Sequence, residues 1–189
     1  SASYAVNSDL TIESADGVNP TAVTAESCNI HLNKYDAKYY GSLGTLSNCK
    51  VTIDESAVWA VGRELSDTSI IIDSLVYDYN AQDRGLGRHT FQPSGYLPNW
   101  GGAPTWKNVD YIVKEASGGV AGFSYITADN CRWNINYKGE LIPIVGSTTQ
   151  SSRRYFTNNE VYLTFDDSCT GDIGHLGYFC NTVLKDNFI

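Results

Sequence analysis

The sequence predicts a mainly β protein, with a small α+β domain in its first half and an antiparallel β-sandwich or barrel in its second half. In the second half, apolar and polar residues alternate within short segments, and turn signals return about every 8–12 residues. A stretch rich in Pro and Gly, 93–105, divides the 189 residues into two parts that could each form a domain. We therefore predict domains over 1–92 and 106–189, joined by this stretch as a linker. A long surface loop within one domain is the alternative.

The first half gives mixed signals. Tyr4–Ile12 alternates loosely and predicts a strand. Pro20 begins a segment, 20–26, that suits a short helix, because Pro is favoured in the first helical turn. Asp54–Ala57 also resembles a helix start, although the apolar residues that follow it over 58–61 would suit a strand. Ser69–Tyr77 is rich in β-branched residues and predicts a buried strand.

The second half reads as β throughout. Six strands are predicted there, over 109–115, 120–128, 132–137, 140–145, 160–165 and 178–184. Ser117–Gly119 and Lys138–Gly139 are predicted to be hairpin turns, with Gly where a positive φ is needed. Pro143 would place its strand at an edge of the sheet. No internal repeat is evident.

Composition excludes several classes of function. Asp and Glu number 21 against 13 Lys and Arg, which gives a formal charge of −8 and argues against a nucleic-acid partner. No apolar run approaches the roughly 18 residues of a membrane-spanning helix, so membrane insertion is not expected. Met is absent altogether. A processed, secreted and extracellular protein is the natural interpretation.

Cysteine usage supports the same compartment. Two local disulfides, Cys28–Cys49 and Cys169–Cys180, are the simplest pairing. Cys131, among apolar and aromatic neighbours, would then be a buried free thiol. Other pairings remain open, because connectivity does not follow from sequence.

The candidate binding residues lie within the linker and close to it on both sides. Tyr96, Trp100 and Trp106 stand among Gly and Pro, and aromatic residues in loops are typical of protein-recognition surfaces and can also stack on sugars. The alternative is that they pack as a plug between two domains. Arg84 and Arg88 flank two Gly residues in an otherwise acidic chain and could contact an anion or a partner protein.

Catalytic and metal-binding motifs are missing from the sequence. His31, His89 and His175 lie far apart and show no metal-ligand spacing, so neither a metal nor another cofactor is expected. Glu115 and Glu140, at predicted strand ends, are the least implausible carboxylate pair for a glycoside hydrolase.

In outline the chain resembles the small secreted effectors of plant-pathogenic fungi, in particular the dual-domain effectors of Fusarium wilt fungi. The resemblance rests on the start Ser1–Tyr4, on Cys28 and Cys49, on the Pro/Gly break at 93–104 and on the β-rich half Val109–Ile189. It implies a non-enzymatic protein of two β-rich domains, made with a pro-segment, secreted into host tissue and recognised by plant immune receptors.

The function expected from the sequence is therefore that of a secreted interaction protein, a monomer that acts as a virulence effector and binds a host protein or immune receptor. A carbohydrate-binding lectin or adhesin is the first alternative. A glycoside hydrolase is the second.

Overall fold

The computed structural model describes residues 3–13, 23–35, 43–57, 62–76, 105–118, 123–124, 127–141, 153–171, 177–178 and 182–189. All regular secondary structure in these ranges is β. The strands are β1 (Ser3–Val6), β2 (Asp9–Ile12), β3 (Val23–Glu26), β4 (Asn29–Tyr35), β5 (Leu43–Ser47), β6 (Lys50–Ser56), β7 (Gly62–Val76), β8 (Thr105–Ser117), β9 (Phe123–Ser124), β10 (Thr127–Asp129), β11 (Arg132–Tyr137), β12 (Glu140–Leu141), β13 (Arg154–Thr157), β14 (Glu160–Phe165), β15 (Thr170–Gly171), β16 (Gly177–Tyr178) and β17 (Thr182–Lys185).

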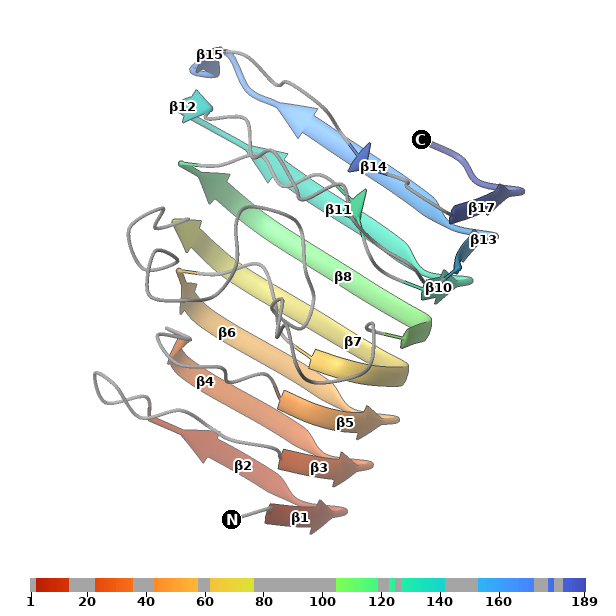
Figure 1. Ribbon diagram of the computed structural model, residues 1–189. Helices are drawn as coiled ribbons and strands as arrows, with labels where there is room; N and C mark the ends of the chain where they lie inside the picture. Colours follow the sequence, from red (N-terminus) through yellow and green to blue (C-terminus); the bar gives the residue numbers. More distant parts are fainter. Residues whose placement is uncertain are drawn as a thin grey trace.

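The strands stack in chain order from the N-terminus to the C-terminus (Figure 1). Thirteen of them belong to one sheet, which follows two parallel paths. The first path is β1-β3-β5-β7-β8-β10-β13-β17, and the second joins β2, β4, β6, β7, β8, β11 and β14. Every neighbouring pair of strands in the described residues runs parallel. This is the architecture of a parallel β-helix, a solenoid in which each coil packs on the next.

A sharp corner joins the two paths in every coil. One residue at each corner has a positive φ of 48–55°, and these residues are Asn7, Ser27, Asn48, Asp67, Asn108, Asn130, Asn158 and Asp186. Asn and Asp tolerate this left-handed conformation better than other residues with a side chain, because their short polar groups can hydrogen-bond locally. The first four corners recur about every 20 residues. The chain is therefore built from repeats, contrary to the prediction from sequence.

The core follows from this repetition. On the first path, the in-register positions of successive coils form a buried column of side chains. Its members are Ala25, Leu46, Leu65, Trp106, Ala128 and Phe156. A second column lines the other path and consists of Ile30, Val51, Ile70, Tyr111, Trp133 and Val161. One continuous apolar cluster therefore runs along the stack.

Aromatic rings fill the wider part of this core. Trp106 stacks on Trp133 with ring centroids 6.1 Å apart and an interplanar angle of 12°. Trp133 stacks in turn on Phe156 at 5.4 Å. Stacked rings contribute to stability beyond the apolar area that they bury. The second half of the solenoid thus has an aromatic centre, whereas the buried side chains described in the first half are mainly aliphatic, with Tyr35 as the aromatic exception.

The described part of the first half contains no helix, so the predicted α+β domain is not seen there. Residues 23–26 of the expected helix form β3, where Ala25 points into the core. Asp54–Ala57 does not begin a helix either, because β6 continues through Ser56, which is buried. Ladder pairing with the coils on both sides stabilises the extended conformation at both places and overrides the local helix signals.

The prediction that the second half forms an antiparallel sandwich or barrel was also wrong, because its described strands pair in parallel. The predicted β content of the second half is confirmed. Lys138–Gly139 does not close a hairpin: β11 pairs with β8 and β14, whereas β12 pairs with β15. Gly139, with a φ of 72°, turns the chain out of the path of β11.

The segment predicted as a linker, 93–105, lies outside the described residues except for Thr105, the first residue of β8. On either side of it, β7 and β8 are hydrogen-bonded neighbours from Glu64–Thr105 to Val76–Ser117. The two predicted domains therefore share one sheet.

Candidate functional site

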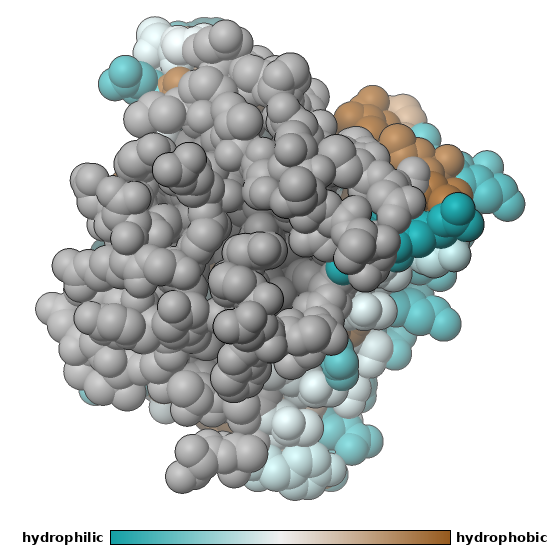
Figure 2. Space-filling model, in the orientation of Figure 1, coloured by the Kyte–Doolittle hydropathy of each residue, from teal (hydrophilic) through white to brown (hydrophobic). Residues whose placement is uncertain are grey.

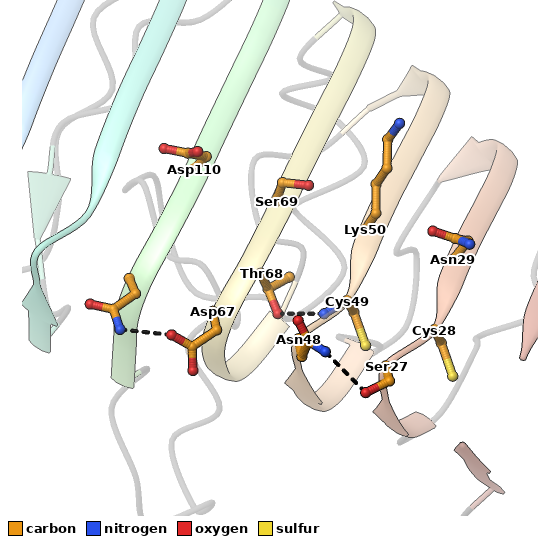
Figure 3. Close-up of a pocket in the computed structure, with 11 residues that line it drawn as sticks. Ser27, Cys28, Asn29, Asn48, Cys49, Lys50, Asp67, Thr68, Ser69 and Asp110 are labelled. Atoms are coloured by element: carbon orange, nitrogen blue, oxygen red, sulfur yellow. Dashed lines mark hydrogen bonds between the residues drawn. The ribbon is translucent and has the colours of Figure 1, made fainter. Parts of the chain in front are cut away.

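A hollow of about 500 Å³ runs along the corners of four successive coils (Figure 3). Its lining is polar apart from two thiols. The lining residues are Ser27, Cys28, Asn29, Asn48, Cys49, Lys50, Asp67, Thr68, Ser69, Asn108 and Asp110. We call this feature the corner groove.

One side of the corner groove is a row of corner residues that form side-chain hydrogen bonds in pairs. Asn48 Nδ2 donates to Ser27 Oγ at 3.0 Å. Asn108 Nδ2 donates to Asp67 Oδ1 at 2.7 Å. The row continues beyond the groove, where Asn130 Nδ2 donates to Asn108 Oδ1 at 2.8 Å. These bonds hold polar groups at a fixed spacing on the outside of the solenoid.

The other side of the groove is a row two residues further along each coil. It consists of Asn29, Lys50, Ser69 and Asp110, which face one another in register on β4, β6, β7 and β8. Neighbouring strands lie about 4.7–4.9 Å apart. Asp110 also accepts a hydrogen bond from Arg132 Nε at 3.1 Å. Each coil thus contributes one residue to each row.

Cys28 and Cys49 lie between the two rows, in equivalent positions of neighbouring coils. Both are buried free thiols, so the predicted Cys28–Cys49 disulfide is absent. Each thiol donates instead to a backbone carbonyl: Cys28 Sγ to Glu26 at 3.3 Å and Cys49 Sγ to Ser47 at 3.2 Å. Burial raises the pKa of the Cys49 thiol.

Cys131 occupies the same position three coils further on and is also a buried free thiol. Burial raises its pKa to about 12. Cys169 is a free thiol as well, and its predicted partner Cys180 lies outside the described residues. In three coils the position after the corner is Cys, which acts there as a small apolar residue.

Thiol labelling tests this assignment. In native protein near pH 8, Cys28, Cys49 and Cys131 are expected to react with iodoacetamide at least about 100-fold more slowly than after unfolding, because the thiolate is the reactive form and all three are buried. In denaturant without reductant, each should take one label, as read by peptide mass spectrometry. If Cys28 and Cys49 instead stay unlabelled in denaturant until a reductant is added, they form a disulfide, which would contradict the structure.

One predicted binding residue, Trp106, lies in the core. Trp106 is 1% exposed and stacks on Trp133, so it is not available to a partner. Its position follows from register, because Trp106 pairs with the buried Leu65 and Ala128 of the coils on either side. The other predicted binding residues, Arg84, Arg88, Tyr96 and Trp100, lie outside the described residues.

Three of the His and Glu residues that the sequence analysis weighed as catalytic or metal-binding groups, His31, Glu115 and Glu140, lie in the described ranges. His31 Nε2 is 2.9 Å from Asp54 Oδ1 on the outer face of β4 and β6. Glu115 pairs with Lys138, and Glu140 is exposed on β12. His89 and His175 lie outside the described ranges.

No three His, Cys, Asp or Glu side chains in the described ranges are placed to hold a metal ion. Those ranges also contain no helix that could cross a membrane.

Sequence reasoning missed the corner groove entirely. The signal that could have found it is a recurring pattern: a corner residue of type Asn, Asp or Ser, then a small residue, then alternation of polar and apolar residues. It is visible in Asn48-Cys49-Lys50-Val51-Thr52-Ile53 and again in Asn130-Cys131-Arg132-Trp133-Asn134-Ile135.

No protein-family model matches the chain, and no curated protein or solved structure matches it either.

Proposed function

We propose that the chain is a non-catalytic binding protein that holds a hydroxyl-rich polymer, a polysaccharide, along the corner groove. One observation carries this proposal: two rows of polar side chains follow the groove, and every coil repeats the same two positions. A surface that repeats along one axis suits a ligand that repeats along the same axis.

The chemistry of the lining supports a sugar. Asn side chains both donate and accept, Asp accepts, and Ser does both, which matches the hydroxyl groups of a carbohydrate. The spacing between coils is comparable to the length of one sugar unit in an extended chain. Lys50 adds a positive charge between Asn29 and Ser69, which gives the groove one site for an acidic substituent.

A protein partner fits the corner groove less well. Energetic centres of protein interfaces are enriched in Trp, Tyr and Arg, and the groove lining contains none of them. Binding of a host protein or immune receptor would instead depend on the 84–100 segment, which is outside the described residues. The effector function expected from the sequence thus stays a prediction that does not involve this groove.

A glycan array with the 189-residue chain tests the proposal, with a Lys50→Ala/Ser69→Ala variant beside it. We expect the variant to bind the selected glycan at least about tenfold more weakly, because hydrogen bonds to charged groups contribute about 1.5–3 kcal/mol each. Both side chains point outward from the sheet, so their removal should change stability by only about 0.5 kcal/mol.

Lys114→Ala is the matched control. Lys114 lies on the same outer face but pairs with Asp73 at 2.7 Å, away from the groove lining. It should bind as the original chain does. Affinity should also rise with oligosaccharide length up to about four units and then level off, because four coils line the groove. An array without a specific glycan, or an equal loss in both variants, would refute the proposal.

A further inference from the structure

Cys28 and Cys49 lie side by side in neighbouring coils of the solenoid. They are in register, because the residues that directly follow them, Asn29 and Lys50, face each other on β4 and β6. The backbone N–H of Lys50 also donates to the carbonyl of Cys28 at 2.9 Å. The Cα atoms of the two Cys residues are therefore one inter-strand spacing apart, about 4.7–4.9 Å.

The two thiols also point in the same direction (Figure 3). Each donates to the carbonyl two residues earlier, Cys28 Sγ to Glu26 at 3.3 Å and Cys49 Sγ to Ser47 at 3.2 Å. Side chains that repeat one conformation on in-register strands keep the spacing of the strands. The two sulfur atoms are therefore also about 4.7–4.9 Å apart.

The fold itself sets this side-chain conformation. In three other coils, the side chain after the corner donates in the same way to the carbonyl two residues earlier: Ser8 to Val6 at 2.8 Å, Thr68 to Ser66 at 2.8 Å and Cys131 to Asp129 at 3.4 Å. The positions of the Cys28 and Cys49 sulfur atoms are thus fixed before any ligand arrives.

This spacing suits a metal ion that binds two thiolates in a line. A metal–thiolate bond is about 2.3 Å long for zinc, so an ion midway between two sulfur atoms spans about 4.6 Å. Soft ions such as Cu(I) prefer thiolate ligands and accept two of them in a linear arrangement. Zinc sites almost always have four ligands, and the described residues offer no group of even three.

Both thiols are buried but close to solvent. Cys28 is 2% exposed and Cys49 is 4% exposed, and both belong to the lining of the corner groove. The surface along the edge where β3 and β5 end is mainly polar (Figure 2). A small ion therefore has a short path from the groove to the thiols.

We propose that Cys28 and Cys49 form a two-coordinate site for a soft metal ion of the Cu(I) class. As the ion binds, each thiol loses its proton to solvent, and one metal–sulfur bond forms at each sulfur atom. Nothing is oxidised or reduced. The Cu(I) complex carries one net negative charge, which Lys50 in the same lining offsets. This site was not expected from the sequence, which predicted no metal.

Cys131 provides a control within the chain. It occupies the same position after its corner and is a buried free thiol, but its in-register neighbours are Val109 and Asn159. A single thiol in such surroundings lacks the second sulfur ligand. Cys131 should therefore not contribute to the site.

The experiment is an anaerobic titration with Cu(I) against a coloured competing chelator. It uses the 189-residue chain with Cys169→Ser/Cys180→Ser, which keeps Cys28, Cys49 and Cys131 as its thiols. We expect one ion per chain. Cys28→Ser and Cys49→Ser should each weaken binding at least about 100-fold, since even ligand-supporting residues cost 10–100-fold. Cys131→Ser should leave the affinity unchanged.

These substitutions are mild, because Ser already fills the equivalent position at Ser8 and donates to the equivalent carbonyl. Circular dichroism should show that each variant keeps its β structure. X-ray absorption at one equivalent of copper should show two sulfur neighbours and no nitrogen or oxygen ligand. Absence of binding, unchanged affinity in Cys28→Ser or Cys49→Ser, or an equal loss in Cys131→Ser would overturn the proposal.

Discussion

Trp106→Ala is expected to lower the free energy of unfolding by about 3–5 kcal/mol, which is the usual cost of removing a large buried aromatic side chain. Trp106 is 1% exposed, and its ring stacks on Trp133 and lies 5.6 Å from Tyr111. The cavity left behind would be lined by rigid strands, so little collapse can offset it. Urea unfolding followed by far-UV circular dichroism measures the change.

Tyr155→Ala is the control for this prediction. Tyr155 is also an aromatic strand residue, on β13, but it points outward and is 48% exposed. Its loss should cost less than about 1 kcal/mol. If instead Trp106→Ala unfolds at the same urea concentration as the original chain, Trp106 does not lie in the core and the proposed register of β8 is wrong.

Asn159→Leu is expected to destabilise the protein by at least about 2 kcal/mol. Asn159 is buried, and its Oδ1 accepts from the backbone N–H of Cys131 at 2.9 Å. Its Nδ2 donates to the carbonyl of Ala128 at 3.1 Å and to Asn187 Oδ1 at 3.1 Å. Leucine has a similar size but takes away these partners, and each buried polar group left unsatisfied costs about 1–3 kcal/mol.

Thr68→Val provides the comparison, because Thr68 occupies the same position three coils earlier. Its Oγ1 accepts from Cys49 N–H at 3.3 Å and donates to the carbonyl of Ser66 at 2.8 Å. Thr68 makes two such bonds where Asn159 makes three, and one of the two is long, so we predict a smaller loss of stability, about 1 kcal/mol. Thermal unfolding of both variants shows which of them loses more stability. A larger loss of stability for Thr68→Val than for Asn159→Leu would contradict the hydrogen bonds assigned to Asn159.

The strand positions were partly predictable, but their partners were not. Arg132–Tyr137 and Glu160–Phe165 form β11 and β14, as predicted. Both strands have one face in the core and one outside, so their residues alternate as those of an antiparallel sheet do. Alternation reports which face is buried and carries no information on strand direction. The parallel partners lie about one coil away in the sequence, beyond the reach of hairpin signals.

The candidate site was less predictable than the fold. Asn48, Lys50 and Asp67 are ordinary exposed residues when taken one at a time. They form a groove only because the stacked coils bring them into register. Trp106 misled the sequence reasoning because Gly and Pro precede it, although β8 has already begun at Thr105. The sequence shows which types of side chain are present, whereas the register between the strands decides which of them lie next to one another.

The pairing of β7 with β8 has a consequence for how the chain folds. These are the two longest of the described strands, with 15 and 13 residues, and their ladder joins both paths of the solenoid. In a linear array of coils, a nucleus can form at one junction and grow by adding neighbours in either direction. The longer connection between β7 and β8 raises the closure cost only slightly, by about 0.6 kcal/mol for each doubling of loop length. We therefore expect the coils at β7 and β8 to form first, and the coils further from this ladder in either direction to form later.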